Sequence, residues 1–191
     1  MESDVRERLL RQGMAMLLRH GYHDLGVNAL LEATSTPKGS FYHYFKSKEQ
    51  FGLEAIDLYM AEAHAGLDMC LNDRKRKPLA RVRRFFELTE EKYRTEGYLG
   101  CLLGGLGQEL SGVSDAFRRK VEECFTSIGA RIAACLQLAV DSGELPKGTD
   151  TQRMATLLIN CWEGAALRCR LLRDPAPLRQ MLDFYFSAAR A

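Results

Sequence analysis

Prolines and long uncharged segments are scarce in this sequence, and both absences narrow the possible folds. Five prolines occur among 191 residues, and the long periodic stretches between them contain none. Because proline breaks a helix interior, this spacing is typical of an all-helical chain. The longest stretch without a charged residue, Gly97–Gln108, is much shorter than the roughly 20 apolar residues that cross a bilayer. Alternating strand patterns are also absent, so the sequence predicts an all-α protein of about nine helices and no membrane partner.

Targeting signals and metal-binding patterns are missing as well. The first residues, Met1–Asp4, are acidic and no apolar block follows them, so we expect no signal peptide and a cytoplasmic location. The six cysteines form no Cys-x-x-Cys pair, and none has a histidine at a metal-ligand spacing. We therefore expect no metal and no cofactor, and cysteines that serve as small buried apolar residues. The net charge of +2 neither indicates nor excludes a nucleic-acid partner.

Helical periodicity is the main signal that the sequence does contain. Apolar residues recur every three or four positions over Val5–Leu18, and Gly21 follows as an expected C-terminal cap. Thr36, Ser47 and Thr149 precede further periodic stretches and are the expected N-caps of those helices. The other helices are expected at residues 27–33, 37–45, 48–71, 78–96, within 97–112, 115–143, 150–169 and 175–189.

Two of the short predicted helices form a candidate DNA-binding motif. The helices at 27–33 and 37–45 are joined by Thr34–Thr36 and have the dimensions of a helix-turn-helix, whose second helix enters the major groove. Polar and basic residues there suit phosphates and base edges. The expected DNA contacts are Lys38, Gly39, Ser40, Tyr42, His43 and Lys48. The alternative is an aromatic cluster that only packs three helices, and Phe41 and Phe45 are expected in the core under either interpretation.

The segment Pro37–Glu49 closely resembles the signature of TetR-family DNA-binding domains, in which Lys-Gly, a small hydroxyl residue, an apolar residue, aromatics, Phe and Ser-Lys-Glu follow in that order. Gly21-Tyr22 and Leu30-Leu31 stand at further landmarks of that family. The resemblance implies a helix-turn-helix domain at 1–48, a ligand-binding and dimerisation domain at 49–191, and a homodimer on a near-palindromic, double-stranded DNA operator. It implies a transcriptional regulator, and not an enzyme, that acts as a repressor released by a small molecule or a reactive electrophile.

Two positions depart from the family pattern. Gly26–Asn28 stands where the family usually has a threonine that bonds a phosphate, so Asn28 is the expected substitute. The usual Ala-Gly-Val turn is Thr34–Thr36, so Ser35 must adopt the conformation that glycine normally takes. Thr36 is included among the expected DNA contacts.

A second segment, Gly97–Gly104, resembles the one that carries the sensing thiol in NemR-like, electrophile-sensing members of the family. Cys101 lies near the start of a predicted short helix, where backbone N–H dipoles favour the thiolate. We expect Cys101, Gln108 and Trp162 to take part in ligand or redox sensing, with Glu109 as another side chain in the same pocket. The alternatives are a pocket for a non-covalent ligand, and a cysteine and a tryptophan that serve only in packing.

The last two predicted helices offer more apolar surface than one domain needs at its end, and the resemblance implies that they pair across a two-fold axis. The expected dimer residues are Leu157, Leu158, Ala165, Leu178, Met181, Leu182 and Tyr185. Two other functions remain possible from the sequence. A thiol-dependent enzyme would need a base beside Cys101, and a dimeric adaptor without a DNA role is disfavoured by the signature over Lys38–Lys48.

Overall fold

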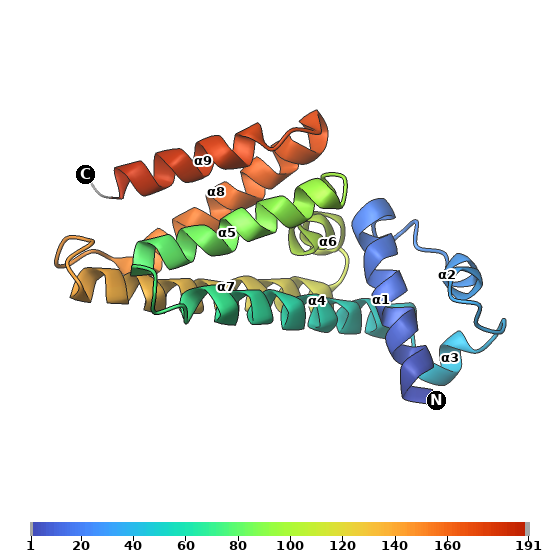
Figure 1. Ribbon diagram of the computed structural model, residues 1–191. Helices are drawn as coiled ribbons and strands as arrows, with labels where there is room; N and C mark the ends of the chain where they lie inside the picture. Colours follow the sequence, from blue (N-terminus) through green and yellow to red (C-terminus); the bar gives the residue numbers. More distant parts are fainter. Residues whose placement is uncertain (1, 190–191) are drawn as a thin grey trace. The chain divides into compact units, whose positions relative to one another are not determined.

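The computed structural model describes residues 2–189, and within this range the chain forms nine α-helices and no strand (Figure 1). The all-α prediction is therefore confirmed. All but one of the helices lie within a few residues of the predicted stretches. They are α1 (Glu2–His20), α2 (Val27–Ala33), α3 (Phe41–Tyr44), α4 (Lys48–Leu71), α5 (Pro78–Thr95), α6 (Leu102–Leu110), α7 (Asp115–Asp141), α8 (Thr151–Leu172) and α9 (Ala176–Ala188).

The exception is the segment that was expected to be the second helix of the motif. The prediction of a helix over 37–45 that is capped by Thr36 is wrong, because α3 spans only the four residues Phe41–Tyr44. Gly39 has a φ of +91°, which no residue of a right-handed helix adopts. Residues 38–40 therefore form a turn, and the helix begins after it.

The other expected N-caps have different outcomes. The cap at Ser47 is confirmed, because its Oγ accepts a hydrogen bond from the Gln50 backbone N at 3.0 Å. The expected cap at Thr149 is wrong. The side chain of Asp150 accepts from the Arg153 backbone N at 2.9 Å, and α8 begins one residue later than predicted. The Thr149 hydroxyl instead donates to a carbonyl oxygen of the preceding turn at 2.6 Å.

The helices pack into two compact units. The first, which we call the N-unit, contains the chain up to Glu62 together with Leu102–Glu122. The second, the C-unit, contains Ala63–Cys101 and the chain from Glu123 onward. The N-unit thus holds α1, α2, α3, α6 and the first parts of α4 and α7. The sequence predicted a domain boundary between residues 48 and 49, and therefore assigned α6 to the C-terminal domain.

Phenylalanines organise the core of the N-unit. The rings of Phe41, Phe45 and Phe51 lie with centroids 4.9 to 5.4 Å apart and are almost fully buried. A Cβ atom on Gly13 would lie 2.1 Å from Cζ of Phe51, so α1 packs against α4 only because this position has no side chain. Residues of α2 complete the core with Leu30 and Leu31. Such burial contributes roughly 1.5 to 3 kcal/mol for each large apolar side chain.

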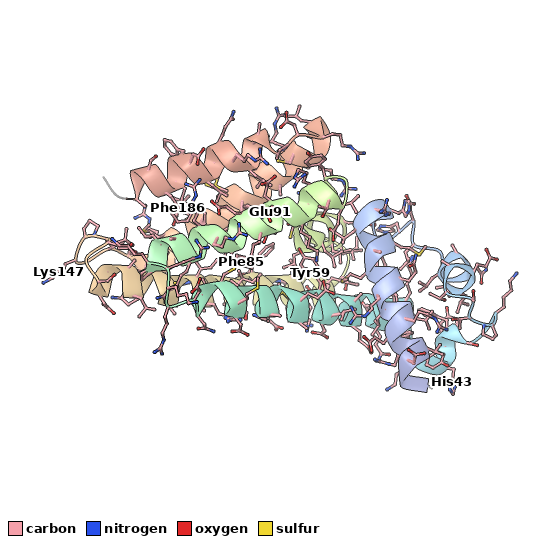
Figure 2. The ribbon with its side chains drawn as sticks, in the orientation of Figure 1. His43, Tyr59, Phe85, Glu91, Lys147 and Phe186 are labelled. Atoms are coloured by element: carbon pink, nitrogen blue, oxygen red, sulfur yellow. The ribbon has the colours of Figure 1, made fainter. Side chains whose placement is uncertain are left out.

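The core of the C-unit surrounds Trp162 of α8. Its ring lies 4.8 Å from that of Phe86 and 5.8 Å from that of Tyr93, both on α5. The C-terminal helix joins the same core through Phe186, labelled in Figure 2, whose ring lies under the Arg83 guanidinium at 5.9 Å. These contacts tie α5, α8 and α9 into one apolar core.

Among the described residues, one helix, α7, is long and apolar enough to cross a bilayer by length and composition alone. Core helices of globular proteins pass the same test. In this chain the apolar side of α7, with Ile132, Leu136 and Ala139, is fully buried in the C-unit core. We therefore interpret α7 as a core helix.

Candidate DNA-binding surface and sensing region

The segment from α2 to α3 presents its polar side chains to solvent. Phe41 and Phe45 are four residues apart and point into the core, so Tyr42 and His43 between them point outward. The side chain of Lys38 is 79% exposed, and Tyr42 as a whole residue is 67% exposed. Figure 2 shows His43 on α3 at the edge of the N-unit. Of the other expected contacts, Asn28 and Gly39 are exposed and Ser40 is half-buried.

The turn between α2 and α3 is held by two threonines. The Thr34 hydroxyl donates to the Leu30 carbonyl oxygen at 2.8 Å and lies 3.0 Å from the Thr36 hydroxyl. Both threonines are buried, so Thr36 supports the turn and drops out of the expected DNA contacts. Ser35 has a φ of +50°, which confirms the expected left-handed conformation at this position.

Lys48, the first residue of α4, is engaged within the N-unit. Its Nζ donates to the His23 carbonyl oxygen at 3.3 Å and lies 4.6 Å from the centroid of the Tyr22 ring. Partial burial lowers the pKa of Lys48, and the nearby carboxylates of Glu109 and Asp24 oppose this shift. An ammonium group has three donors, so the hydrogen bond to His23 leaves donors for a phosphate.

Glu109 of α6 contacts the turn that follows α1. Its Oε2 accepts from the Tyr22 backbone N at 2.8 Å, and its Oε1 accepts from the His23 backbone N at 2.7 Å. Oε1 also lies 2.5 Å from Nδ1 of His23. The carboxylate therefore accepts its hydrogen bonds within the N-unit. The expectation that Glu109 lines the pocket of a sensing thiol is corrected accordingly. Its neighbour Gln108 is exposed. The sequence contains no signal for this contact, because the partners lie 86 and 87 residues apart.

The thiol of Cys101 has an acidic neighbour in the C-unit. Cys101 directly precedes α6 and is half-buried, and it donates a hydrogen bond to the carboxylate of Glu163 on α8. Burial raises the pKa of Glu163 to about 7, and the hydrogen bond from Cys101 opposes the rise. Sequence reasoning looked for a base near Cys101 along the chain and missed Glu163, which lies on another helix.

The other cysteines differ from Cys101 in their surroundings. All six are free thiols, and Cys161 is the only other one that is not buried. Burial raises the pKa values of Cys70, Cys135 and Cys169. Among residues 2–189, no three His, Cys, Asp or Glu side chains are grouped so that they could hold a metal ion. Trp162, the other residue expected in sensing, is buried in the core of the C-unit against Phe86 and Tyr93.

Comparison with known proteins identifies the family. A model described as "Bacterial regulatory proteins, tetR family" matches residues 9–55, and one described as "Tetracyclin repressor-like, C-terminal domain" matches residues 78–185. Transcriptional regulator AcuR of Cereibacter sphaeroides is 38% identical over 173 residues, which cover 90% of this chain and 79% of that protein. The chain belongs to the TetR family.

Solved structures agree with this assignment. The regulatory protein TetR from Rhodobacter sphaeroides has a TM-score of 0.89 and 37% identity over 94% of this chain and 95% of that one. The reduced form of NemR from Escherichia coli has a TM-score of 0.84 and 28% identity over 95% of both chains. NemR of Escherichia coli K12 is named an HTH-type transcriptional repressor and is 29% identical over 95% of this chain and 92% of its own. The protein is therefore a DNA-binding transcriptional regulator, and the thiol-dependent enzyme is excluded. TetR-family regulators act as dimers and respond to small-molecule effectors.

The structure corrects four of the seven residues expected at the dimer interface. Leu158, Leu178, Leu182 and Tyr185 are buried within the core of a single protomer, while Ala165 and Met181 pack against that core. Adjacent residues of a helix point about 100° apart, so Leu157 is exposed although Leu158 is buried. Of the expected set, Leu157 is exposed. The exposed large apolar residues of α8 and α9 are Leu157, Leu167, Leu171, Leu172 and Phe184.

Proposed function

We propose that this TetR-family regulator is a homodimeric repressor that reads a near-palindromic operator with α3 and the turn before it. The observation that supports this most directly is that α3 has one buried side and one exposed side. Phe41 fixes the helix in the core, while Tyr42 and His43 face solvent beside the exposed Lys38. In a two-fold dimer, two such helices read half-sites about one helical turn apart, roughly 34 to 36 Å. We also propose a cytoplasmic location, because the target is bacterial DNA.

The exposed residues divide into two roles. Lys38 and the bare backbone at Gly39 are exposed in the turn before α3, and we assign them to base edges. Asn28 lies in the first turn of α2, where the helix N-terminus also favours a phosphate. Lys48 stands at the corresponding place in α4. Ser40, Tyr42 and His43 are assigned to the phosphate backbone between these points.

The test is operator binding by variants that change one charge. Fluorescence anisotropy would compare DNA from the region flanking the gene with a scrambled duplex over a range of salt concentrations. We expect Lys38→Ala to reduce the preference for the operator about tenfold or more, because a bidentate base contact contributes roughly 1 to 3 kcal/mol. Lys48→Ala should weaken binding to both duplexes and reduce the salt slope by about one.

The matched control is Lys147→Ala, which removes another exposed lysine, one that lies in the C-unit (Figure 2). It should leave both affinity and sequence preference unchanged. If Lys38→Ala and Lys147→Ala bind the operator as the unmodified protein does, α3 and its turn are not the reading surface.

For the effector we propose a reactive electrophile that is taken up by Cys101. An α,β-unsaturated carbonyl compound is the simplest example. The Sγ atom forms a bond to the β-carbon as the carbon–carbon π bond opens, and the thiol proton passes to the carboxylate of Glu163. The same proton then goes from Glu163 to the α-carbon, so no oxidant or cofactor is needed. The hydrogen bond between Cys101 and Glu163 supports this role, because it places an acceptor at the thiol proton.

A further inference from the structure

The carboxylate of Glu109 lies against the turn that follows α1, where both of its oxygens have hydrogen-bond donors. The turn after α1 directs two successive backbone N–H groups, those of Tyr22 and His23, toward α6. Each N–H donates to a different oxygen of Glu109, at 2.8 and 2.7 Å. Gly21 makes the approach possible. Its φ is +81°, and a Cβ atom there would lie 2.7 Å from Oε2 of Glu109.

This contact continues toward the DNA-binding helices. The carbonyl oxygen of His23 accepts from Nζ of Lys48, and the ring of Tyr22 lies below the same ammonium group. The turn itself leads through Leu25, which is almost fully buried, into α2. The last turn of α6 is therefore hydrogen-bonded to the turn that leads into α2, and Lys48, at the start of α4, donates to the same turn.

A second set of contacts holds the neighbouring part of α7 in the N-unit without Glu109. The Ser114 hydroxyl donates to Oε1 of Glu49 at 2.7 Å. The ring of Phe117 packs against Tyr22 at 5.2 Å, and it lies so close to Gly52 that a Cβ atom there would be 2.7 Å from Cζ. Loss of the Glu109 contact should therefore loosen the turn after α1 and leave the N-unit folded.

We propose that Glu109 is a positioning residue for operator binding, which holds the turn after α1 and makes the arrangement of α2 and Lys48 depend on the position of α6. The proposal rests on the proposed function in one respect, namely that α2, α3 and Lys48 bind the operator. It gives α6 a defined part in regulation. Cys101 is the residue directly before α6, and eight helical residues, 102–109, join it to Glu109, so α6 is the route by which a change at the thiol would reach the turn.

Glu109→Gln is the most direct variant, because glutamine has the same shape but only one acceptor oxygen. One of the two N–H groups then faces an amide NH2 group, and the turn loses at least one bond. The matched control is Glu123→Gln, the same chemical change at an exposed position of α7. Gly21→Ala disturbs the same contact from the side of the turn. If the contact is shared, the effects of Glu109→Gln and Gly21→Ala on operator affinity are not additive.

The experiment measures hydrogen–deuterium exchange of the intact protein, with and without operator DNA, and operator affinity by anisotropy. Without DNA, we expect the backbone amide hydrogens of residues 21–26 to exchange about tenfold faster in Glu109→Gln than in the unmodified protein. The urea midpoint of the variant should stay close to that of the unmodified protein. Operator affinity should fall about tenfold. In the unmodified protein, DNA should slow exchange in α6 as well, because coupling between two sites is reciprocal. In Glu109→Gln this slowing in α6 should disappear, and Glu123→Gln should behave as the unmodified protein.

The proposal is overturned if Glu109→Gln keeps slow exchange at residues 21–26, or if it loses that protection and still binds the operator normally. It is also overturned if operator DNA leaves α6 exchange unchanged in the unmodified protein. Failure of the proposed function has a different signature. In that case the unmodified protein would show no preference for the operator over the scrambled duplex, whatever the exchange of its turn.

Discussion

Two partly buried carboxylates, those of Glu109 and Glu163, have pKa values that their surroundings shift in opposite directions. Burial disfavours the charged form of Glu109, but hydrogen bonds from Tyr22 and His23 outweigh it and lower its pKa. Burial raises the pKa of Glu163 to about 7, and its one hydrogen bond, from Cys101, does not compensate. Glu109 is therefore a permanent anion at neutral pH and acts as a structural acceptor. Glu163 exchanges its proton near neutral pH and suits proton transfer.

Cys101 should react faster with electrophiles than the other five cysteines, and Glu163 should be the reason. Mass-spectrometric labelling with limiting N-ethylmaleimide would measure the rate at each cysteine. We expect the rate at Cys101 to rise as the pH passes about 7, because Glu163 accepts the thiol proton only after losing its own. Glu163→Gln should slow this labelling several-fold at pH 8 and remove the rise near pH 7.

The control for this prediction is Cys161, the other cysteine that is not buried. Its labelling should be slower than that of Cys101 and unaffected by Glu163→Gln. Labelling of the unmodified protein should also release the operator, and Cys101→Ser should prevent that release. Equal labelling rates at Cys101 and Cys161 would mean that the effector binds reversibly and that the thiol serves in packing.

Contacts at the level of single residues were predictable only where they are local. The resemblance places Ser35 where the family turn has a glycine, so Ser35 was expected to adopt the glycine conformation, and its φ of +50° confirms this. The burial of Thr36 and the contact between Glu109 and the turn after α1 were not predictable. Their partners are chosen by packing, and in the case of Glu109 they come from the opposite end of the N-unit sequence. The pairing of Cys101 with Glu163 has the same origin, because it joins residues of two helices.

At the scale of elements, apolar periodicity and caps were sufficient for every long helix. The start of α3 was not predictable in this way, because its four residues are too few to show a helical repeat of apolar residues. The aromatic residues that follow suggested a longer helix, but Gly39 adopts a turn conformation. The start of α8 was misplaced by one residue. Thr149 was the expected cap because Gln152 follows three residues later, as in a capping box, but the adjacent Asp150 is the better capping residue and takes that place.

The cap of α8 gives a direct test at this scale. Asp150→Ala should destabilise the protein by about 1 kcal/mol, because it removes the acceptor for the Arg153 backbone N and a negative charge at the helix N-terminus. Thr149→Ala, the matched control, should have a smaller effect because its hydroxyl bonds only within the preceding turn. Urea unfolding monitored by circular dichroism measures both. A larger loss from Thr149→Ala would show that the threonine is the effective cap.

At the scale of the whole molecule, the division into two units follows from where the apolar side chains gather. α6 contributes Leu102, Leu103 and Leu106 to buried positions in the N-unit, so it packs with the DNA-binding helices although it lies far from them in sequence. The sequence predicted two domains from the family resemblance and placed the boundary at the end of the signature. It contained no information on which unit would include α6, because a short glycine-rich helix has apolar residues that suit either core.

Exposed apolar residues of α8 and α9 are the candidates for the interface between protomers. Leu157 and Leu171 of α8 are fourteen residues apart, which is close to four helical turns, so they lie on one face of that helix. Phe184 of α9 is 74% exposed. In water an exposed apolar face of this kind favours association with a second copy. We therefore predict that Leu157, Leu171 and Phe184 belong to the interface between protomers.

Phe184→Glu should convert the dimer to monomers in sedimentation velocity at micromolar concentration, with little change in the urea midpoint. Operator affinity should fall by orders of magnitude, because a monomer engages only one half-site. Leu182→Asp is the informative contrast. Its side chain is in the protomer core, so the charge should unfold the C-unit at a cost of more than about 4 kcal/mol. Val113→Glu controls for the loss of an exposed apolar residue, since Val113 is also 74% exposed but lies in the N-unit. It should remain dimeric, and a dimeric Phe184→Glu variant would show that another surface joins the protomers.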